Sequence, residues 1–407
     1  MTQSRGWSPI GLVAGALVYP VVNPWREVDE IKESWLGLGL TYLLAQPSPD
    51  SNPYIIMSTP KEPEDTPEPQ RVPSPPPHTT FSTRGILPPS FPTFKPREYR
   101  FNSSHAMNHV AWSCDGKRLA AVGIDKVTRV WVPEKGMEQK HATVFSGGHQ
   151  DDVDYVSWNP THPDLFCTSS QKDRRIVFWD ARQSRYTQSV PLKVSPMLTS
   201  YSPNGRTLLY TSAGHSLFFL DLLKEGEDSK EIWRQNPTQR TVASFALWNH
   251  SGDGFATTYY SETSLRILDY PSLTRKEELP AHPGGCMALA LDPRGRYLAS
   301  GGFDSIVNLF DVEEWICTHT ITACDHRING ISFSHDGEYL AIGSAGSYVE
   351  ICGTETGLSL HRVPTSAPAT AVTWHPSRHA LAYCGQTRPR EGGPAPVAVL
   401  GLFGMLE

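Results

Sequence analysis

The stretch "SSQKDRRIVFWD", residues 169–180, contains the pattern that decides the fold. A turn with Asp173 is followed by an alternating apolar run that ends in Trp179 and Asp180. Such alternation is typical of a β-strand, because successive side chains point to opposite faces of a sheet. One strand alone does not define a fold, so the question is whether the pattern recurs along the chain.

The pattern recurs six more times. In each copy a large apolar anchor ends one strand, a turn rich in Asp, Asn, Gly or Pro follows, and further strands come next. The intervals between anchors are 46, 43, 47, 43, 42 and 41 residues. A period of 40–45 residues with four strands per copy is typical of WD40 repeats. We therefore predict an all-β fold, a seven-bladed WD40 β-propeller over residues 95–407. The anchors are Trp112, Trp158, Tyr201, Trp248, Leu291, Phe333 and Trp374.

The last copy is one strand short. Its inner strands are expected in residues 371–384, and the segment "PVAVLGLF", residues 396–403, supplies one more before the sequence ends. The segment "KPREYRF", residues 95–101, precedes the first copy and has no blade of its own. A closed ring leaves few exposed strand edges. We therefore predict that residues 95–101 pair as the outer strand of the last blade and close the propeller.

Residues 1–94 differ in composition and are predicted to form a largely disordered leader. Fifteen of the 35 prolines fall in residues 47–96. Because proline fixes φ and removes a backbone donor, residues 47–94 are predicted to be an extended, mobile linker. Within residues 23–44, Asn23 and Pro24 could start a short helix with an apolar stripe. That helix could bind a partner, rest on the propeller or fluctuate without binding, and all three interpretations stay open.

Composition excludes several classes of function. The net charge of −6 gives no basic footprint for nucleic acid. The seven cysteines are scattered without a Cys-x-x-Cys pair, so free thiols are expected and no metal site. The apolar run of residues 10–22 is too short to span a membrane. Without a Walker loop, a His-Glu-x-x-His motif or a nucleotide-binding Gly-x-Gly-x-x-Gly, we expect no enzyme, no cofactor and no small-molecule substrate.

His149, Ser169 and Asp173 are the residue types of a hydrolase triad, but their spacing indicates a structural role. In a WD40 blade, a His, a Ser or Thr, an Asp and the Trp of Trp-Asp form a buried hydrogen-bonded tetrad. Here the tetrad would be His149, Ser169, Asp173 and Trp179, because a buried indole N–H needs an acceptor. No nucleophile elbow surrounds Ser169.

Two further copies of this arrangement are incomplete. His282, Ser300 and Asp304 form a partial tetrad, with Phe310 in place of Trp. Asp125 and Trp131 correspond to the Asp and Trp of a blade whose Ser position is an Ala. Recurrence at similar spacing favours scaffolding over catalysis, so no catalytic residues are assigned.

Two groups of basic residues could contact a partner. Lys172, Arg174 and Arg175 form a local basic cluster in one turn, which could bind a phosphate or an acidic protein or could be solvated. Arg182 ends the segment "WDAR", residues 179–182, which fits the Trp-Asp-x-Arg pattern of substrate receptors of cullin-type ubiquitin ligases. An ordinary strand end with a solvated or paired Arg explains the same letters.

The wording of six ordered segments resembles one family of WD40 proteins. They include "WNPTHPDLFCTSSQKDRRIVFWDAR" (158–182), "AHPGGCMALALDPRGRYLASGGFDSIVNLFDVEEWIC" (281–317) and "WHPSRHALAY" (374–383). The others are "HVAWSCDGKRLA" (109–120), "LDYPSL" (268–273) and "ISFSHDGEYLAIGSA" (331–345). Together they resemble the WD40-repeat subunits of the THO complex, over residues 97–403.

This resemblance implies a nuclear, non-catalytic scaffold in transcription-coupled messenger ribonucleoprotein assembly and mRNA export, within the larger TREX assembly. The implied partners are the large helical THO subunits and, indirectly, an RNA helicase and an export adaptor. RNA contact would be indirect or weak, in agreement with the acidic balance. The alternative is a ubiquitin-ligase substrate receptor that acts through Asp180 and Arg182.

Overall fold

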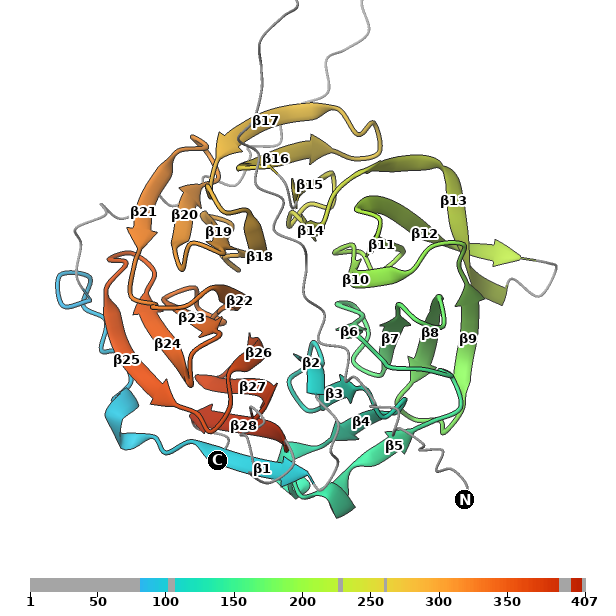
Figure 1. Ribbon diagram of the computed structural model, residues 1–407, viewed down its shortest axis with the longest axis horizontal. Helices are drawn as coiled ribbons and strands as arrows, with labels where there is room; N and C mark the ends of the chain where they lie inside the picture. Colours follow the sequence, from blue (N-terminus) through green and yellow to red (C-terminus); the bar gives the residue numbers. More distant parts are fainter. Residues whose placement is uncertain (1–80, 102–106, 226–229, 260–261, 388–396, 405–407) are drawn as a thin grey trace, which may run out of the picture. The chain divides into compact units, whose positions relative to one another are not determined.

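The computed structural model describes residues 81–101, 107–225, 230–259, 262–387 and 397–404. These residues form seven four-stranded antiparallel sheets, arranged as blades around a central axis (Figure 1). The predicted seven-bladed β-propeller is confirmed. The predicted helix in residues 23–44 lies outside the described residues.

The first three blades follow the chain in order. Blade 1 contains β2 (Met107–Trp112), β3 (Leu119–Gly123), β4 (Thr128–Trp131) and β5 (Thr143–Phe145). Two 3-10 helices, η2 (Pro133–Lys135) and η3 (Gln139–His141), lie between β4 and β5. Blade 2 contains β6 (Tyr155–Trp158), β7 (Leu165–Ser170), β8 (Arg175–Asp180) and β9 (Tyr186–Pro191). Blade 3 contains β10 (Pro196–Tyr201), β11 (Thr207–Ser212), β12 (Ser216–Glu225) and β13 (Lys230–Val242).

The remaining blades continue the order up to the last one. Blade 4 contains β14 (Phe245–Trp248), β15 (Gly254–Thr258), β16 (Ser264–Asp269) and β17 (Arg275–Pro280). Blade 5 contains β18 (Cys286–Leu291), β19 (Tyr297–Gly302), β20 (Val307–Asp311) and β21 (Cys317–Ile321). Blade 6 contains β22 (Ile328–Phe333), β23 (Tyr339–Ser344), β24 (Tyr348–Gly353) and β25 (Ser359–Pro364). Blade 7 contains β26 (Ala369–Trp374), β27 (Ala380–Gln386) and β28 (Ala398–Gly404), together with β1 (Arg97–Phe101).

Burial changes from the inner to the outer strand of a blade. Second strands such as β3, β19 and β23 are buried along their whole length. Outer strands such as β17, with the sequence RKEELP, are almost entirely exposed. Charged side chains on an outer strand discourage pairing with another sheet edge. Each blade therefore buries its middle strands between its two neighbours.

Three of the four Trp anchors of the repeat couple neighbouring blades, whereas the indole N–H of Trp374 has no hydrogen-bond partner among the described residues. The indole N–H of Trp158 donates to the Ala111 carbonyl of blade 1 at 3.0 Å, and that of Trp248 donates to the Ser200 carbonyl of blade 3 at 3.2 Å. In the same way Trp112 donates to the Thr373 carbonyl of blade 7 at 3.3 Å. Each acceptor directly precedes the anchor of the preceding blade. The indole thus satisfies its own buried donor and fixes the spacing between two inner strands.

Strand β1 supplies the outer strand of blade 7. It pairs antiparallel with β28, in register from Arg97 opposite Leu402 to Phe101 opposite Ala398. Glu98 of β1 also accepts the Ser366 backbone N–H at 2.8 Å and the Tyr383 hydroxyl at 3.2 Å. The ring is therefore completed by a segment that precedes the first repeat, and β1 lies beside β28 near the end of the chain (Figure 1).

The prediction of a mobile linker over residues 47–94 is wrong for its last part, residues 81–94. Residues 81–94 pack on blades 6 and 7 and contain the 3-10 helix η1 (Phe91–Thr93). Phe91 is 3% exposed and lies edge-on to Tyr339 at 5.0 Å, while Phe94 contacts Phe403 at 5.7 Å. The composition misled because prolines continue to position 96, whereas the aromatic side chains between them have an apolar surface to bury. Among the described residues, no helix is long and apolar enough to cross a membrane.

Candidate functional site

The polar cluster of blade 2 contains Thr168 in the place predicted for Ser169. The Trp179 indole N–H donates to the Thr168 hydroxyl at 2.8 Å, and that hydroxyl lies 2.7 Å from His149 Nε2. His149 Nδ1 then lies 2.9 Å from the Asp173 carboxylate. Since the carboxylate only accepts, the chain of bonds runs from Trp179 through Thr168 and His149 to Asp173. The prediction of Ser169 in this tetrad is wrong.

Strand alternation explains why Thr168 takes this place. In the β7–β8 register, Phe166 lies opposite Trp179 and Thr168 lies opposite Val177, so Thr168 and Trp179 share one face. Ser169 points to the other face, where its hydroxyl donates to the Met197 carbonyl of blade 3 at 2.9 Å. Thr168 belongs to the tetrad within blade 2, and Ser169 connects blade 2 to blade 3.

The electrostatics of this cluster suit a structural role. Burial alone would raise the pKa of Asp173, but the hydrogen bond and charge of His149 and the Gln150 N–H outweigh it and hold that pKa below its usual value. The Thr168 side chain is completely buried and uses its hydroxyl in two hydrogen bonds. A nucleophile must reach a substrate, so this geometry supports folding rather than hydrolysis.

Blade 5 brings together the three residues of the predicted partial tetrad. His282 Nε2 lies 2.8 Å from the Ser300 hydroxyl, and His282 Nδ1 lies 3.1 Å from both carboxylate oxygens of Asp304. Phe310 takes the position of Trp and supplies no donor. The cluster therefore keeps the Ser–His–Asp part of the relay without the indole.

Blade 1 does not bring Asp125 and Trp131 together. Asp125 forms an ion pair with Arg129 at 2.5 Å. The Trp131 indole N–H instead donates to the Glu138 carbonyl at 3.2 Å, in the connection between β4 and β5. With Ala121 in the Ser/Thr position, no hydroxyl links the two residues. The register places these residues where the sequence put them, with Leu119 opposite Trp131, but this blade has no hydrogen-bonded tetrad.

The predicted basic contacts are partly neutralised within the chain. Lys172 forms ion pairs with Asp152 and, at 3.6 Å, with Asp151. Arg174 is exposed and Arg175 is half-buried, and neither has an ion pair among the residues that the structure describes. Arg182 donates to both oxygens of Asp180, at 2.9 and 2.7 Å. The Arg182 guanidinium thus neutralises the aspartate of its own motif, as at an ordinary strand end.

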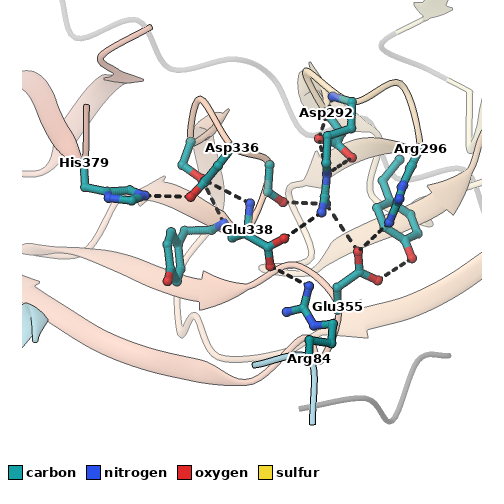
Figure 2. Close-up of polar contacts among 12 residues, drawn as sticks. Arg84, Asp292, Arg296, Asp336, Glu338, Glu355 and His379 are labelled. Carbon is teal, nitrogen blue, oxygen red and sulfur yellow. Dashed lines mark hydrogen bonds and ion pairs between the residues drawn. The ribbon is translucent and has the colours of Figure 1, made fainter. Parts of the chain in front are cut away.

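A larger polar network, which sequence reasoning missed, joins blades 5 and 6 (Figure 2). Arg294 donates to both oxygens of Asp292, to Glu338 at 2.9 Å and to the Gly337 carbonyl at 2.6 Å. Glu355 lies 3.3 Å from Arg294 and accepts the hydroxyl of Tyr297 at 2.7 Å. The carboxylates of Asp292 and Glu355 are fully buried. Burial raises the pKa of Asp292, although the charge of Arg294 opposes this shift.

Arg84 connects this network to the segment that precedes β1. It forms an ion pair with Glu338 at 2.7 Å and lies over the Phe81 ring at 5.2 Å. Figure 2 shows the Arg84 guanidinium facing the Glu338 carboxylate beside Glu355. The network thus contains three guanidinium groups, with that of Arg296, and three carboxylates, a balance that buried charges require. Arg84, Glu338 and Glu355 are far in the sequence from Asp292 and Arg294, so local patterns gave no signal for their contacts.

Several cavities lie among the described residues, and two of them differ clearly in their lining. One, of about 360 Å³, is lined by the inner strands of all seven blades and includes Asn108, His109, Asp154 and Tyr155. The His109 ring stacks on Tyr155 at 3.7 Å, and burial lowers the pKa of His109 to about 3. The other, of about 220 Å³, lies between blades 4 and 5 and is largely apolar. Neither gathers the groups of a hydrolytic or redox centre.

Comparison with known proteins identifies the repeats. The WD domain, G-beta repeat family matches residues 97–132, 139–180 and 273–311. The family described as Anaphase-promoting complex subunit 4 WD40 domain matches residues 315–377. The β-propeller domain of Cps50 (Swd1) from Myceliophteria thermophila superposes with a TM-score of 0.61 at 18% identity, over 76% of this chain and 100% of that one. This last likeness concerns the fold alone.

Two relatives extend the comparison to whole proteins. The chain is 26% identical over 313 residues to WD repeat-containing protein AAC3 of Dictyostelium discoideum, covering 70% of this chain and 63% of the relative. It is 34% identical over 300 residues to THO complex subunit 3 of Arabidopsis thaliana, covering 73% of this chain and 92% of that protein. The chain therefore belongs to the THO complex subunit 3 family of WD40 proteins.

Proposed function

We propose that this propeller is a non-catalytic scaffold subunit of the THO complex that acts in the nucleus, in messenger ribonucleoprotein assembly and mRNA export. The observation that carries the proposal is the 34% identity to Arabidopsis THO complex subunit 3 over 92% of that protein. A likeness of that extent covers the propeller as a whole rather than one repeat. The proposed partners are the large helical THO subunits, with the helicase and the export adaptor recruited through them.

The geometry supports a binding role. Both His–Asp clusters, with the Thr168 hydroxyl in one and the Ser300 hydroxyl in the other, are buried and use their polar groups on one another. An acidic chain whose Lys172 and Arg182 already pair with aspartates favours protein partners over a direct, strong contact with RNA. We propose that any RNA contact is indirect or weak.

The leader forms a second part of the proposal. Residues 23–44 lie outside the described residues, and their apolar stripe would suit a groove on a helical partner. The exposed side of the Lys172–Arg175 turn is a further, minor candidate contact. Both can be tested within one experiment on the full chain.

The test is affinity purification of the tagged full chain from nuclear extract, with mass spectrometry of the proteins that co-purify. We expect the large THO subunits in stoichiometric amounts. Deletion of residues 23–44 tests the leader, and combined charge reversal of Lys172, Arg174 and Arg175 tests the basic turn. Arg182→Ala serves as the matched control and should leave recovery unchanged. Recovery of a cullin and its adaptor, lost on Arg182→Ala, would contradict the proposal.

A further inference from the structure

Three metal-ligand side chains meet at the junction of blades 6 and 7. His335 and Asp336 lie in the turn between β22 and β23, and His379 lies in the turn between β26 and β27. Their donor atoms all lie within 4.8 Å of one another. Figure 2 shows His379 pointing at Asp336 across the junction. Two imidazoles and a carboxylate from rigid turns are thus gathered around one point.

The local structure holds the carboxylate in place. Asp336 Oδ1 accepts the Ser334 hydroxyl at 2.5 Å and the Glu338 backbone N–H at 3.1 Å. These bonds leave Oδ2 free to face His379 Nε2, which lies 2.7 Å away. A carboxylate oriented by neighbouring donors is the arrangement that outer-shell hydrogen bonds give to metal ligands.

The second imidazole has one ring nitrogen that is not used in a hydrogen bond. The ring centroids of His335 and His379 lie 4.7 Å apart. His335 Nδ1 is covered by protein and has no hydrogen-bond partner among the described residues. A buried nitrogen without a partner destabilises the fold, so its position calls for a physical reason. An ion shared with His379 and Asp336 would supply one.

We propose that His335, Asp336 and His379 form a zinc-binding site, with the fourth position open to water or to a partner's side chain. Zinc takes imidazole nitrogen and carboxylate oxygen in tetrahedral sites, with bonds of about 2.0–2.2 Å. Ligand atoms around such an ion are about 3.3 Å apart, which lies between the 2.7 Å contact and the 4.8 Å limit. Asp336 and His379 are 32% and 29% exposed, which gives an ion access from solvent.

Zinc binding here would replace the hydrogen bond between His379 and Asp336. The ion accepts electron pairs from His379 Nε2 and from the Asp336 carboxylate, and the hydrogen of the neutral imidazole moves from Nε2 to Nδ1, so the step balances without net loss of a proton. The ion would then connect a turn of blade 6 to a turn of blade 7, the blade that β1 completes. The corresponding turns of blades 4 and 5 are connected by a hydrogen bond instead, which His250 Nε2 donates to the Asp292 carbonyl at 2.8 Å.

The expectation of no metal site came from the absence of Cys-x-x-Cys spacing. The proposed ligands include no cysteine and are separated by 43 residues between Asp336 and His379. The packing of two consecutive blades brings the two turns together. The sequence therefore gave no signal for this site.

The test uses the full chain freed of metal with a chelator, titrated with zinc chloride alone by isothermal calorimetry. We expect one equivalent to bind and to raise the melting temperature, while magnesium chloride does neither. Cobalt(II) at the same site should show the visible absorption of tetrahedral coordination. His379→Gln, which keeps a donor toward Asp336, should weaken zinc binding by more than about tenfold.

His250→Ala is the matched control, because His250 occupies the position of His335 in the turn of blade 4. It should leave the zinc affinity unchanged even if stability falls. If His379→Gln does not fold, His335→Gln gives the same readout. Absence of saturable zinc binding, or binding that both His335→Gln and His379→Gln leave intact, would overturn the proposal.

Discussion

The junction between blades 6 and 7 and the junction between blades 4 and 5 use the same register but are filled differently. Tyr339 in β23 and Gly254 in β15 occupy the same position in their blades. Each directly precedes the residue that lies opposite the anchor, Leu340 opposite Phe333 and Phe255 opposite Trp248. At the first junction, Tyr339 and Phe91 fill the space between the sheets. At the second, a crevice of about 220 Å³ remains beside Trp248 and Trp315.

The repeat therefore defines the frame but not the contents of each junction. Phe91 comes from a segment outside the repeats, and Arg84 from the same segment binds Glu338 of blade 6. The N-terminal segment 81–101 therefore packs into one junction as well as completing one sheet. Five changes test how the blades and their junctions are held together, and the largest effect is expected at Phe91.

Phe91→Ala should lower the free energy of unfolding by about 3–5 kcal/mol, because it leaves a cavity between Tyr339 and Phe403. Equilibrium unfolding in urea measures this. Leu87→Ala, in the same segment but 95% exposed, is the matched control and should have almost no effect. Equal effects of the two substitutions would show that residues 81–94 do not hold the junction.

Glu338→Gln should cost about 3 kcal/mol, because it removes one charge from a buried network and leaves Arg84 and Arg294 less neutralised. Urea unfolding again gives the value. Glu313→Gln on the exposed turn of blade 5 should change stability by less than about 0.5 kcal/mol. A stability of Glu338→Gln equal to that of Glu313→Gln would contradict the role of this network.

Thr168→Ala should cost about 2–3 kcal/mol, because it leaves both the Trp179 N–H and His149 Nε2 without a partner. Ser169→Ala removes one bond, the one to blade 3, and should cost about 1 kcal/mol. Thermal unfolding of the two variants separates a bond within a blade from a bond between blades. A larger loss of stability in Ser169→Ala than in Thr168→Ala would contradict the assignment of Thr168 to the tetrad.

Trp315→Ala should cost less than Phe91→Ala, about 1–2 kcal/mol, because its ring borders a crevice that is already open on one side. Urea unfolding of the two variants side by side compares an open junction with a filled one. A loss at Trp315 as large as that at Phe91 would show that the crevice is closed in solution.

Acid should weaken a contact at the junction of blades 1 and 2. Because burial lowers the pKa of His109 to about 3, the unfolded chain binds a proton below pH 6.5 that the folded chain does not bind until about pH 3. This contribution to stability is complete above pH 6.5 and falls by about 1.4 kcal/mol per pH unit below it. Unfolding at pH 7 and pH 5.5 measures the loss. His109→Phe removes this proton-binding group, so the variant should lose less stability between pH 7 and pH 5.5 than the wild-type chain. An equal loss of stability in both would contradict the lowered pKa of His109.

The fold was predictable because its signal is periodic. Seven anchors at intervals of 41–47 residues indicate seven blades, and the unpaired segment 95–101 follows from counting strands. Strand alternation in β7 also indicates Thr168, because Thr168 lies two residues after Phe166 and so on the same face as Trp179. This part of the tetrad was therefore predictable from the sequence.

The rest required the ring itself. Arg84 and Glu338, like Asp336 and His379, meet only because segments far apart in the sequence pack side by side in the fold. No local pattern marks residues 81–94 as packed, because their prolines resemble those of the leader and only their aromatic side chains differ. Contacts between blades are set by long-range geometry, which spacing within one repeat does not contain.

The most direct measurement of the scaffold assignment is reconstitution from purified components. The full chain is mixed with the recombinant large THO subunits and analysed by size-exclusion chromatography with light scattering. If the chain is a THO subunit, it should co-elute with them as one stoichiometric complex. The amount of complex formed by Phe91→Ala should fall in proportion to the fraction of that variant that is unfolded. Separate elution of the folded wild-type chain at micromolar concentrations would contradict the assignment.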